Sequence, residues 1–109
     1  SQVLPAPMPY SVAKVALNTF AKVISKDLAP QVRVNVVSPG NIIFDGGTWD
    51  EKLSSNRKEV EEYINNNVPM KSFGLPEDIA NTIIFLSSSE GKFICGSNII
   101  VDGGQNSSF

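Results

Sequence analysis

The stretch Arg33-Val34-Asn35-Val36-Val37-Ser38-Pro39-Gly40 decides the fold that this sequence predicts. Its first part, Val32 to Val37, is largely apolar and β-branched, which is typical of a parallel strand covered on both faces. In open α/β sheets, ligands gather at the carboxyl ends of the strands. The Pro39-Gly40 turn is therefore a candidate contact for a cofactor. A plain strand-to-loop turn is the alternative interpretation, and the residues alone favour it.

A helix and a second strand are predicted further along the chain. Pro76-Glu77-Asp78 is a strong helix start, because proline suits the first turn and carboxylates are stabilised near the positive end of the helix dipole. Ser97 to Val101 is predicted to form the second strand, and Asp102-Gly103-Gly104 to bend the chain after it. These elements make one right-handed βαβ unit of an α/β fold. Because two parallel strands are not an independently stable sheet, we expect the chain to be a portion of a larger domain.

Residues 45–72, between the first strand and the helix, are much richer in charged side chains than the segments around them. The pattern predicts one or two short amphipathic helices over the sheet. Such segments often serve as substrate lids, although a solvated surface helix would explain the charges equally well. Three larger side chains, Trp49, Tyr63 and Met70, could line a substrate pocket or anchor the lid to the core. We favour anchoring.

Tyr10 and Lys14 lie near the start of a helical pattern that continues to Ala29-Pro30. A step of four residues places two side chains on one face of a helix, about 5–6 Å apart at Cβ. A nearby ammonium favours the ionised form of a phenol, so the pair could act as an acid and base. The spacing alone fits equally well an exposed lysine beside a half-buried tyrosine. The wide apolar arc of this helix predicts burial on more than one side, within one domain or against a second subunit.

Composition excludes several classes of function. The net charge is −2 and no basic cluster is present, so nucleic acid is not an expected partner. The sequence has no histidine and one cysteine, Cys95, so we expect no metal site and no Ser-His-Asp machinery. Cys95 has apolar neighbours, which predicts a buried structural thiol. No apolar run approaches the roughly 18 residues of a membrane span, and a cytoplasmic location is the default expectation.

Four blocks of the sequence resemble, in order and spacing, the C-terminal part of the short-chain dehydrogenase/reductase family. They are Tyr10-Ser11-Val12-Ala13-Lys14, the stretch from Arg33 to Gly40, Phe73-Gly74-Leu75-Pro76-Glu77-Asp78-Ile79-Ala80, and Gly96 with Val101-Asp102-Gly103-Gly104. The resemblance implies that residues 1–109 are the C-terminal portion of one doubly wound, Rossmann-like parallel sheet, incomplete on its own, with 45–72 as its lid. It also implies an NAD(P)-dependent oxidoreductase for a small carbonyl or alcohol substrate, with a 3-oxoacyl-thioester reductase and a sugar or secondary-alcohol dehydrogenase both open. A homo-oligomer, either a dimer or a tetramer, is expected.

The same resemblance implies the roles of individual residues. Tyr10 would exchange a proton with the substrate oxygen. Lys14 would activate Tyr10 and hydrogen-bond the nicotinamide ribose, so that both residues also contact the cofactor. The turn at Pro39 and Gly40 and the backbone of Ile42 would hold the nicotinamide of NAD or NADP.

Two positions depart from the family pattern. Phe44 stands where a threonine usually bonds the cofactor, and Ser72 where an arginine often precedes the Phe-Gly pair. The family's catalytic serine and its glycine-rich phosphate loop are absent from these 109 residues, so this chain alone should not turn over substrate. The competing hypothesis is a truncated or degenerate member that serves as a non-catalytic oligomerisation or interaction module. The intact Tyr10 and Lys14 argue against that hypothesis, whereas Phe44 and Ser72 argue for it.

Overall fold

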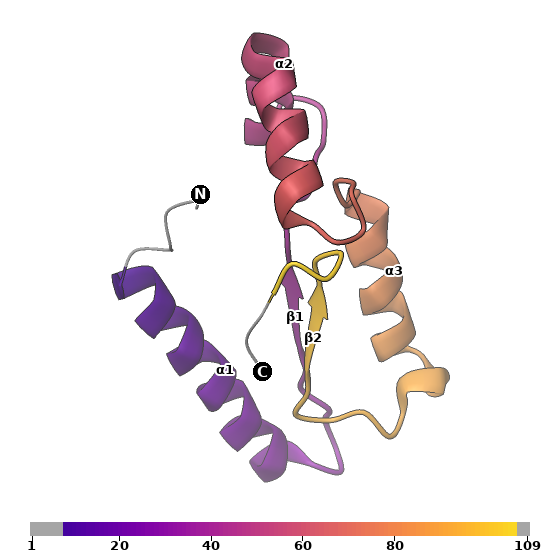
Figure 1. Ribbon diagram of the computed structural model, residues 1–109. Coiled ribbons are helices and arrows are strands. Elements are labelled where there is room, and N and C mark those ends of the chain that lie inside the picture. Colours follow the sequence, from indigo (N-terminus) through magenta and orange to yellow (C-terminus); the bar gives the residue numbers. More distant parts are fainter. Residues whose placement is uncertain (1–7, 107–109) are drawn as a thin grey trace. The chain divides into compact units, whose positions relative to one another are not determined.

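The computed structural model describes residues 8–106 of the chain. Along these residues the elements are α1 (Met8–Leu28), β1 (Val36–Pro39), α2 (Thr48–Asn67), α3 (Pro76–Ser87), the 3₁₀ turn η1 (Ser89–Gly91) and β2 (Asn98–Val101) (Figure 1). The two strands are hydrogen-bonded neighbours and run in the same direction, which confirms the predicted α/β class. The chain forms two compact units, one of Ser1–Val36 with Phe93–Asn98 and the other of Val37–Lys92 with Ile99–Phe109.

In the first unit, α1 packs against the segment that precedes β2. Ala21 and Ser25 are the buried side chains of this helix. Gly96 has a φ of +77°, and a Cβ there would lie 2.7 Å from the hydroxyl of Ser25, so the close approach requires glycine. Cys95 points its sulfur at the carbonyl of Ser25 (3.8 Å) but is exposed, so the prediction of a buried thiol is wrong.

The prediction that α1 is buried on more than one side, within one domain or against a second subunit, stays a prediction. The helix forms where its apolar pattern predicts, but most of the apolar side chains along it remain exposed. They are Tyr10, Val12, Val15, Leu17, Phe20, Val23 and Leu28. The apolar pattern therefore predicted the helix correctly, and its exposed apolar face is the surface that a covering partner would contact.

The first strand begins later than the apolar pattern predicts. We expected Val32 to Val37, whereas the ladder starts at Val36, whose N–H donates to the carbonyl of Ser97 (2.8 Å). Just before it, the side chain of Asn35 accepts from the N–H of Ser97 and donates to the carbonyl of Ile94. The side-chain oxygen of Asn35 thus accepts from the N–H of Ser97, which in a regular ladder would donate to a backbone carbonyl. Along this strand Val36 and Val37 are half-buried, Ser38 is buried and Pro39 is exposed.

In the second unit, α2 carries the small apolar core. The helix is broken at Asn56 (φ −145°, ψ 56°), so it consists of two helical segments, in agreement with the prediction of one or two helices over 45–72. Val60, Ile64 and Val68 are buried on or just after α2, and Leu86 of α3 is buried as well. These side chains fix the end of α2 that leads back to the strands.

The helix α3 begins where the sequence predicts. Pro76 occupies its first turn, and the carboxylate of Asp78 accepts a hydrogen bond from the N–H of Leu75 (2.7 Å). This contact satisfies one of the free N–H groups at the helix start. The carboxylate of Asp78 therefore caps the start of α3.

Candidate active site

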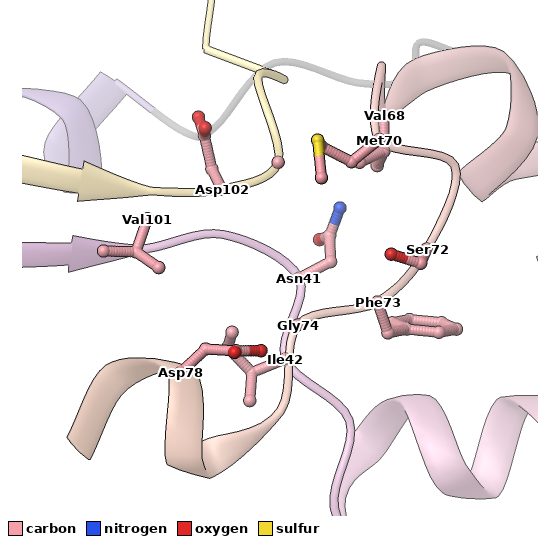
Figure 2. A pocket seen from close by; sticks show the side chains of 11 residues that line it. Asn41, Ile42, Val68, Met70, Ser72, Phe73, Gly74, Asp78, Val101 and Asp102 are labelled. Carbon is pink, nitrogen blue, oxygen red and sulfur yellow. The ribbon is translucent and has the colours of Figure 1, made fainter. Parts of the chain in front are cut away.

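A cavity of about 280 Å³ lies in the second unit, where β1 and β2 end (Figure 2). The N–H of Gly40 donates to the carbonyl of Val101 (2.9 Å), which holds the two strand ends together. The carboxyl end of a parallel sheet is the expected place for a ligand in an α/β fold. The lining residues are Asn41, Ile42, Val68, Met70, Ser72, Phe73, Gly74, Asp78, Val101, Asp102 and Gly103.

The loop after β1 continues as a short ladder with the segment before α3. Ile42 and Gly74 form a parallel bridge, in which Ile43 donates to the carbonyl of Gly74 (3.0 Å) and Gly74 donates to the carbonyl of Asn41 (2.9 Å). In this pattern the flanking residues bond to Gly74, so the N–H and C=O of Ile42 itself point to the opposite side of the ladder. Within residues 8–106 neither group has a backbone partner. Ile42 therefore presents one donor and one acceptor, the pair that a carboxamide needs.

The turn after β2 closes the cavity on another side. Gly103 has a φ of +65°, and a Cβ there would lie 2.8 Å from the side chain of Val68. Its carbonyl accepts from the N–H of Met70 (3.0 Å). Glycine permits both the turn and the close contact with the chain that leaves α2.

The three large side chains proposed for the lid lie in two places. Trp49 stacks on Tyr63 within α2, with ring centroids 5.5 Å apart, and also meets Phe73 at 5.3 Å. Met70 lines the cavity, where Figure 2 shows it beside Asn41. The aromatic cluster supports the anchoring role for Trp49 and Tyr63, whereas Met70 is placed to touch a ligand.

The structure places Tyr10 and Lys14 one turn apart on α1, in the first unit. Both side chains are exposed, Tyr10 by 59%. Pro39 ends β1, and Gly40 and Ile42 follow it directly, so the residues proposed to hold the nicotinamide are contiguous in the second unit. Tyr10 and Lys14 thus lie together in the first unit, and Pro39, Gly40 and Ile42 lie together in the second unit.

The two positions that depart from the family pattern differ in their surroundings. The ring of Phe44 covers Gly47, where a Cβ would lie 2.8 Å from it, and the carbonyl of Phe44 accepts from the N–H of Gly47. Phe44 therefore closes the turn that leads into α2. Ser72 lines the cavity with a short hydroxyl in place of a long cation.

Some residues at the cavity were not predicted as site residues. Asn41 lies two residues after β1 and Asp102 directly follows β2, and the carboxylate of Asp102 accepts from the N–H groups of Gly104 (2.9 Å) and Asn106 (2.7 Å). A polar residue in the loop that follows a parallel strand is the signal that could have found both.

None of the helices between residues 8 and 106 is long and apolar enough to cross a membrane. In that range there is also no group of three or more cysteine, aspartate or glutamate side chains that could hold a metal ion.

A family model described as enoyl-(acyl carrier protein) reductase matches residues 1–106. The chain belongs to the short-chain dehydrogenase/reductase family. Among curated members, isoepoxydon dehydrogenase patN of Aspergillus clavatus is 38% identical over 99 residues, which are 90% of this chain and 38% of that relative. The predicted family is therefore confirmed, and the chain spans about two fifths of the length of the curated relative.

Solved structures of short-chain dehydrogenases/reductases confirm the Rossmann-like fold. L-sorbose reductase from Gluconobacter frateurii, complexed with NADPH and L-sorbose, is 30% identical with a TM-score of 0.82, over 99% of this chain and 44% of its own. A 4-hydroxyisoleucine dehydrogenase complexed with NADH is 33% identical with a TM-score of 0.81, over 98% and 43%. Both structures contain a nicotinamide cofactor, and this chain corresponds to less than half of each.

Proposed function

We propose that this chain is the C-terminal part of an NAD(P)-dependent oxidoreductase that moves a hydride between nicotinamide and a carbonyl or secondary-alcohol carbon. Residues 1–109 would then belong to one Rossmann-like domain, with 45–72 as the substrate lid. The observation that carries the proposal is the Tyr10 and Lys14 pair on one face of α1 in a member of this family. The relatives solved with NADPH and with NADH support a nicotinamide cofactor.

Tyr10 is the proposed proton donor and acceptor. In the reductive direction its hydroxyl gives a proton to the carbonyl oxygen, and in the oxidative direction its phenolate takes one from the alcohol. Lys14, one helical turn away, is the proposed activator of Tyr10 and the proposed hydrogen-bond donor to the nicotinamide ribose. Positioned acid–base transfer of this kind typically contributes about 10²–10⁴ in rate.

The loop after β1 fits a nicotinamide. Ile42 presents its N–H and C=O away from the ladder with Gly74, which matches the acceptor and donor of a carboxamide. Gly40 meets Asp102 so closely that a Cβ would lie 2.5 Å from the Cβ of Asp102, so the turn at Pro39 and Gly40 is held in one place. When bound, the nicotinamide supplies or accepts the hydride, and this loop would set its orientation.

Steady-state turnover of the full-length protein tests the proposal. NADH or NADPH oxidation is measured with a panel of ketones, 3-oxoacyl thioesters and sugars, for the wild type and for Tyr10→Phe and Lys14→Met. We expect kcat to fall by about 10²–10⁴ in Tyr10→Phe, because the ring remains and only the proton-transferring hydroxyl is lost. Lys26→Met, on the last turn of the same helix, is the matched control for Lys14→Met and should keep wild-type kcat. Unchanged turnover in Tyr10→Phe would contradict the assignment.

A non-catalytic role is the second candidate, and the exposed apolar face of α1 favours it. Val12, Val15, Phe20 and Val23 are each at least 55% exposed, an arrangement that calls for a covering partner. In the enzyme hypothesis the rest of the domain and a second subunit of a dimer or tetramer cover this face. A full-length protein that oligomerises but neither binds NADH or NADPH nor reduces any member of the panel would favour the interaction module.

A further inference from the structure

The turn after β2 holds the side chain of Gln105 in a defined place. The carboxylate of Asp102 accepts from the N–H groups of Gly104 and Asn106, on either side of Gln105. The N–H of Gln105 donates to the carbonyl of Asp102 (3.3 Å). Gly103 and Gly104 supply the positive φ values, +65° and +91°, that the turn needs. The backbone at Gln105 is therefore held in place by contacts that do not involve its side chain.

The amide of Gln105 connects two segments that are distant in sequence. Its Oε1 accepts a hydrogen bond from Nδ2 of Asn41 (2.6 Å), and its Nε2 donates to the hydroxyl of Tyr63 (3.2 Å). Asn41 lies 64 positions and Tyr63 42 positions before Gln105. All three side chains belong to the second unit and are partly buried. The amide of Gln105 joins these two partners by accepting from one and donating to the other.

Each end of this bridge belongs to a part of the proposed site. Asn41 directly precedes Ile42, whose free backbone groups face the proposed nicotinamide site. Tyr63 lies on α2, in the proposed lid, and stacks on Trp49 (5.5 Å). The Asn67 amide also donates to the backbone carbonyl of Tyr63 (2.9 Å), which ties the backbone at Tyr63 to the last turn of α2. A shift of either segment would strain or break the Gln105 contacts.

We propose that Gln105 is a positioning residue that couples the loop after β1 to the lid helix α2. With the bridge formed, an ordered lid holds Asn41, and through it the backbone of Ile42, in the arrangement that receives the cofactor. Because coupling between two sites is reciprocal, cofactor bound at Ile42 stabilises the ordered lid by the same free energy by which the ordered lid favours cofactor binding. The identity of the ligand rests on the proposed function, whereas the coupling of the two segments does not.

Amide hydrogen exchange of the full-length protein tests the coupling without any turnover. Gln105→Met keeps the length of the side chain but removes the donor and the acceptor. We expect exchange to rise about tenfold in peptides covering residues 41–43 and in those covering 60–67, because both segments lose the same partner. Gln105→Glu should restore protection, since its two oxygens can accept from Asn41 and from the Tyr63 hydroxyl. Ser55→Ala, which removes an exposed hydroxyl from α2, is the control and should change neither segment.

Cofactor binding supplies the second measurement. In Gln105→Met the Kd for NADH or NADPH should rise about tenfold while kcat changes less than threefold, because Gln105 is not proposed to touch the reacting atoms. Tyr63→Phe should have a smaller effect in the Gln105→Met background than in the wild type. Faster exchange confined to residues 102–106 would overturn the coupling and leave Gln105 a purely local role. A protein that binds neither cofactor would defeat the proposed function, and the exchange of residues 41–43 and 60–67 would still decide this inference.

Discussion

The close approach of the two strand ends makes Gly40→Ala the sharpest test of the structure. A Cβ built on Gly40 lies 2.5 Å from Cβ and 2.7 Å from Cα of Asp102, and the second of these is a backbone atom that no rotamer change can move. Carbon atoms are in favourable contact at about 3.5–4.0 Å, so the strand ends must separate by about 1 Å. The hydrogen bond from Gly40 to Val101 (2.9 Å) lies in the same place and would lengthen with them.

The expected change in the free energy of unfolding combines two destabilising effects and one stabilising effect. Overpacking of a tight contact costs about 1–3 kcal/mol, and weakening a hydrogen bond costs about 1 kcal/mol more. Alanine has less conformational entropy than glycine in the unfolded chain, and this difference stabilises the folded variant by about 0.4–1 kcal/mol. Gly40→Ala should therefore lower the free energy of unfolding by about 2–3 kcal/mol, a large share of the roughly 5–15 kcal/mol typical of a domain.

Urea unfolding of the full-length protein measures this difference. Gly46→Ala is the matched control, because a Cβ there has no neighbour within 4 Å and the substitution is opposed only by the φ of +81°. That strain costs about 1 kcal/mol. If Gly40→Ala costs no more than Gly46→Ala, the strand ends do not meet as described, and the reasoning from the contact is refuted.

Substitutions at three further positions test local features of the second unit by the same unfolding measurement. Asp78→Ala should cost about 1 kcal/mol because it removes the acceptor of the Leu75 N–H, and Asp78→Asn should cost less; equal costs would argue against the cap. Lys71 has a φ of +61°, so Lys71→Gly should be more stable than Lys71→Ala by about 1 kcal/mol, and the reverse order would speak against that backbone conformation. Ile64 is 4% exposed, so Ile64→Ala should cost about 2–5 kcal/mol and Ile64→Val about 1 kcal/mol, whereas a negligible cost for both would remove Ile64 from the core.

Local patterns in the sequence predicted the helices well. The helix at Pro76 starts where proline and two carboxylates favour it, and the two helical segments on either side of Asn56 agree with the prediction of one or two helices over 45–72. The strand was less predictable, because its start depends on the Asn35 side chain replacing a backbone partner from a segment some 60 residues later. The exposure of Cys95 was not predicted for a similar reason, because its apolar neighbours in the sequence do not indicate which segments cover the sulfur.

The later position of β1 also decides which residues reach the candidate site. A strand ending at Val37 would have put Ser38 at the carboxyl end, whereas the observed strand runs to Pro39 and delivers Asn41 and Ile42 to the cavity. Strand register sets the neighbours of every following residue, and no local pattern specifies it when neither face of the strand is fully buried. The Asn41–Gln105 contact arises only in this register, which is why the sequence predicted the family's backbone contact at Ile42 but not the side chain that would hold it in place.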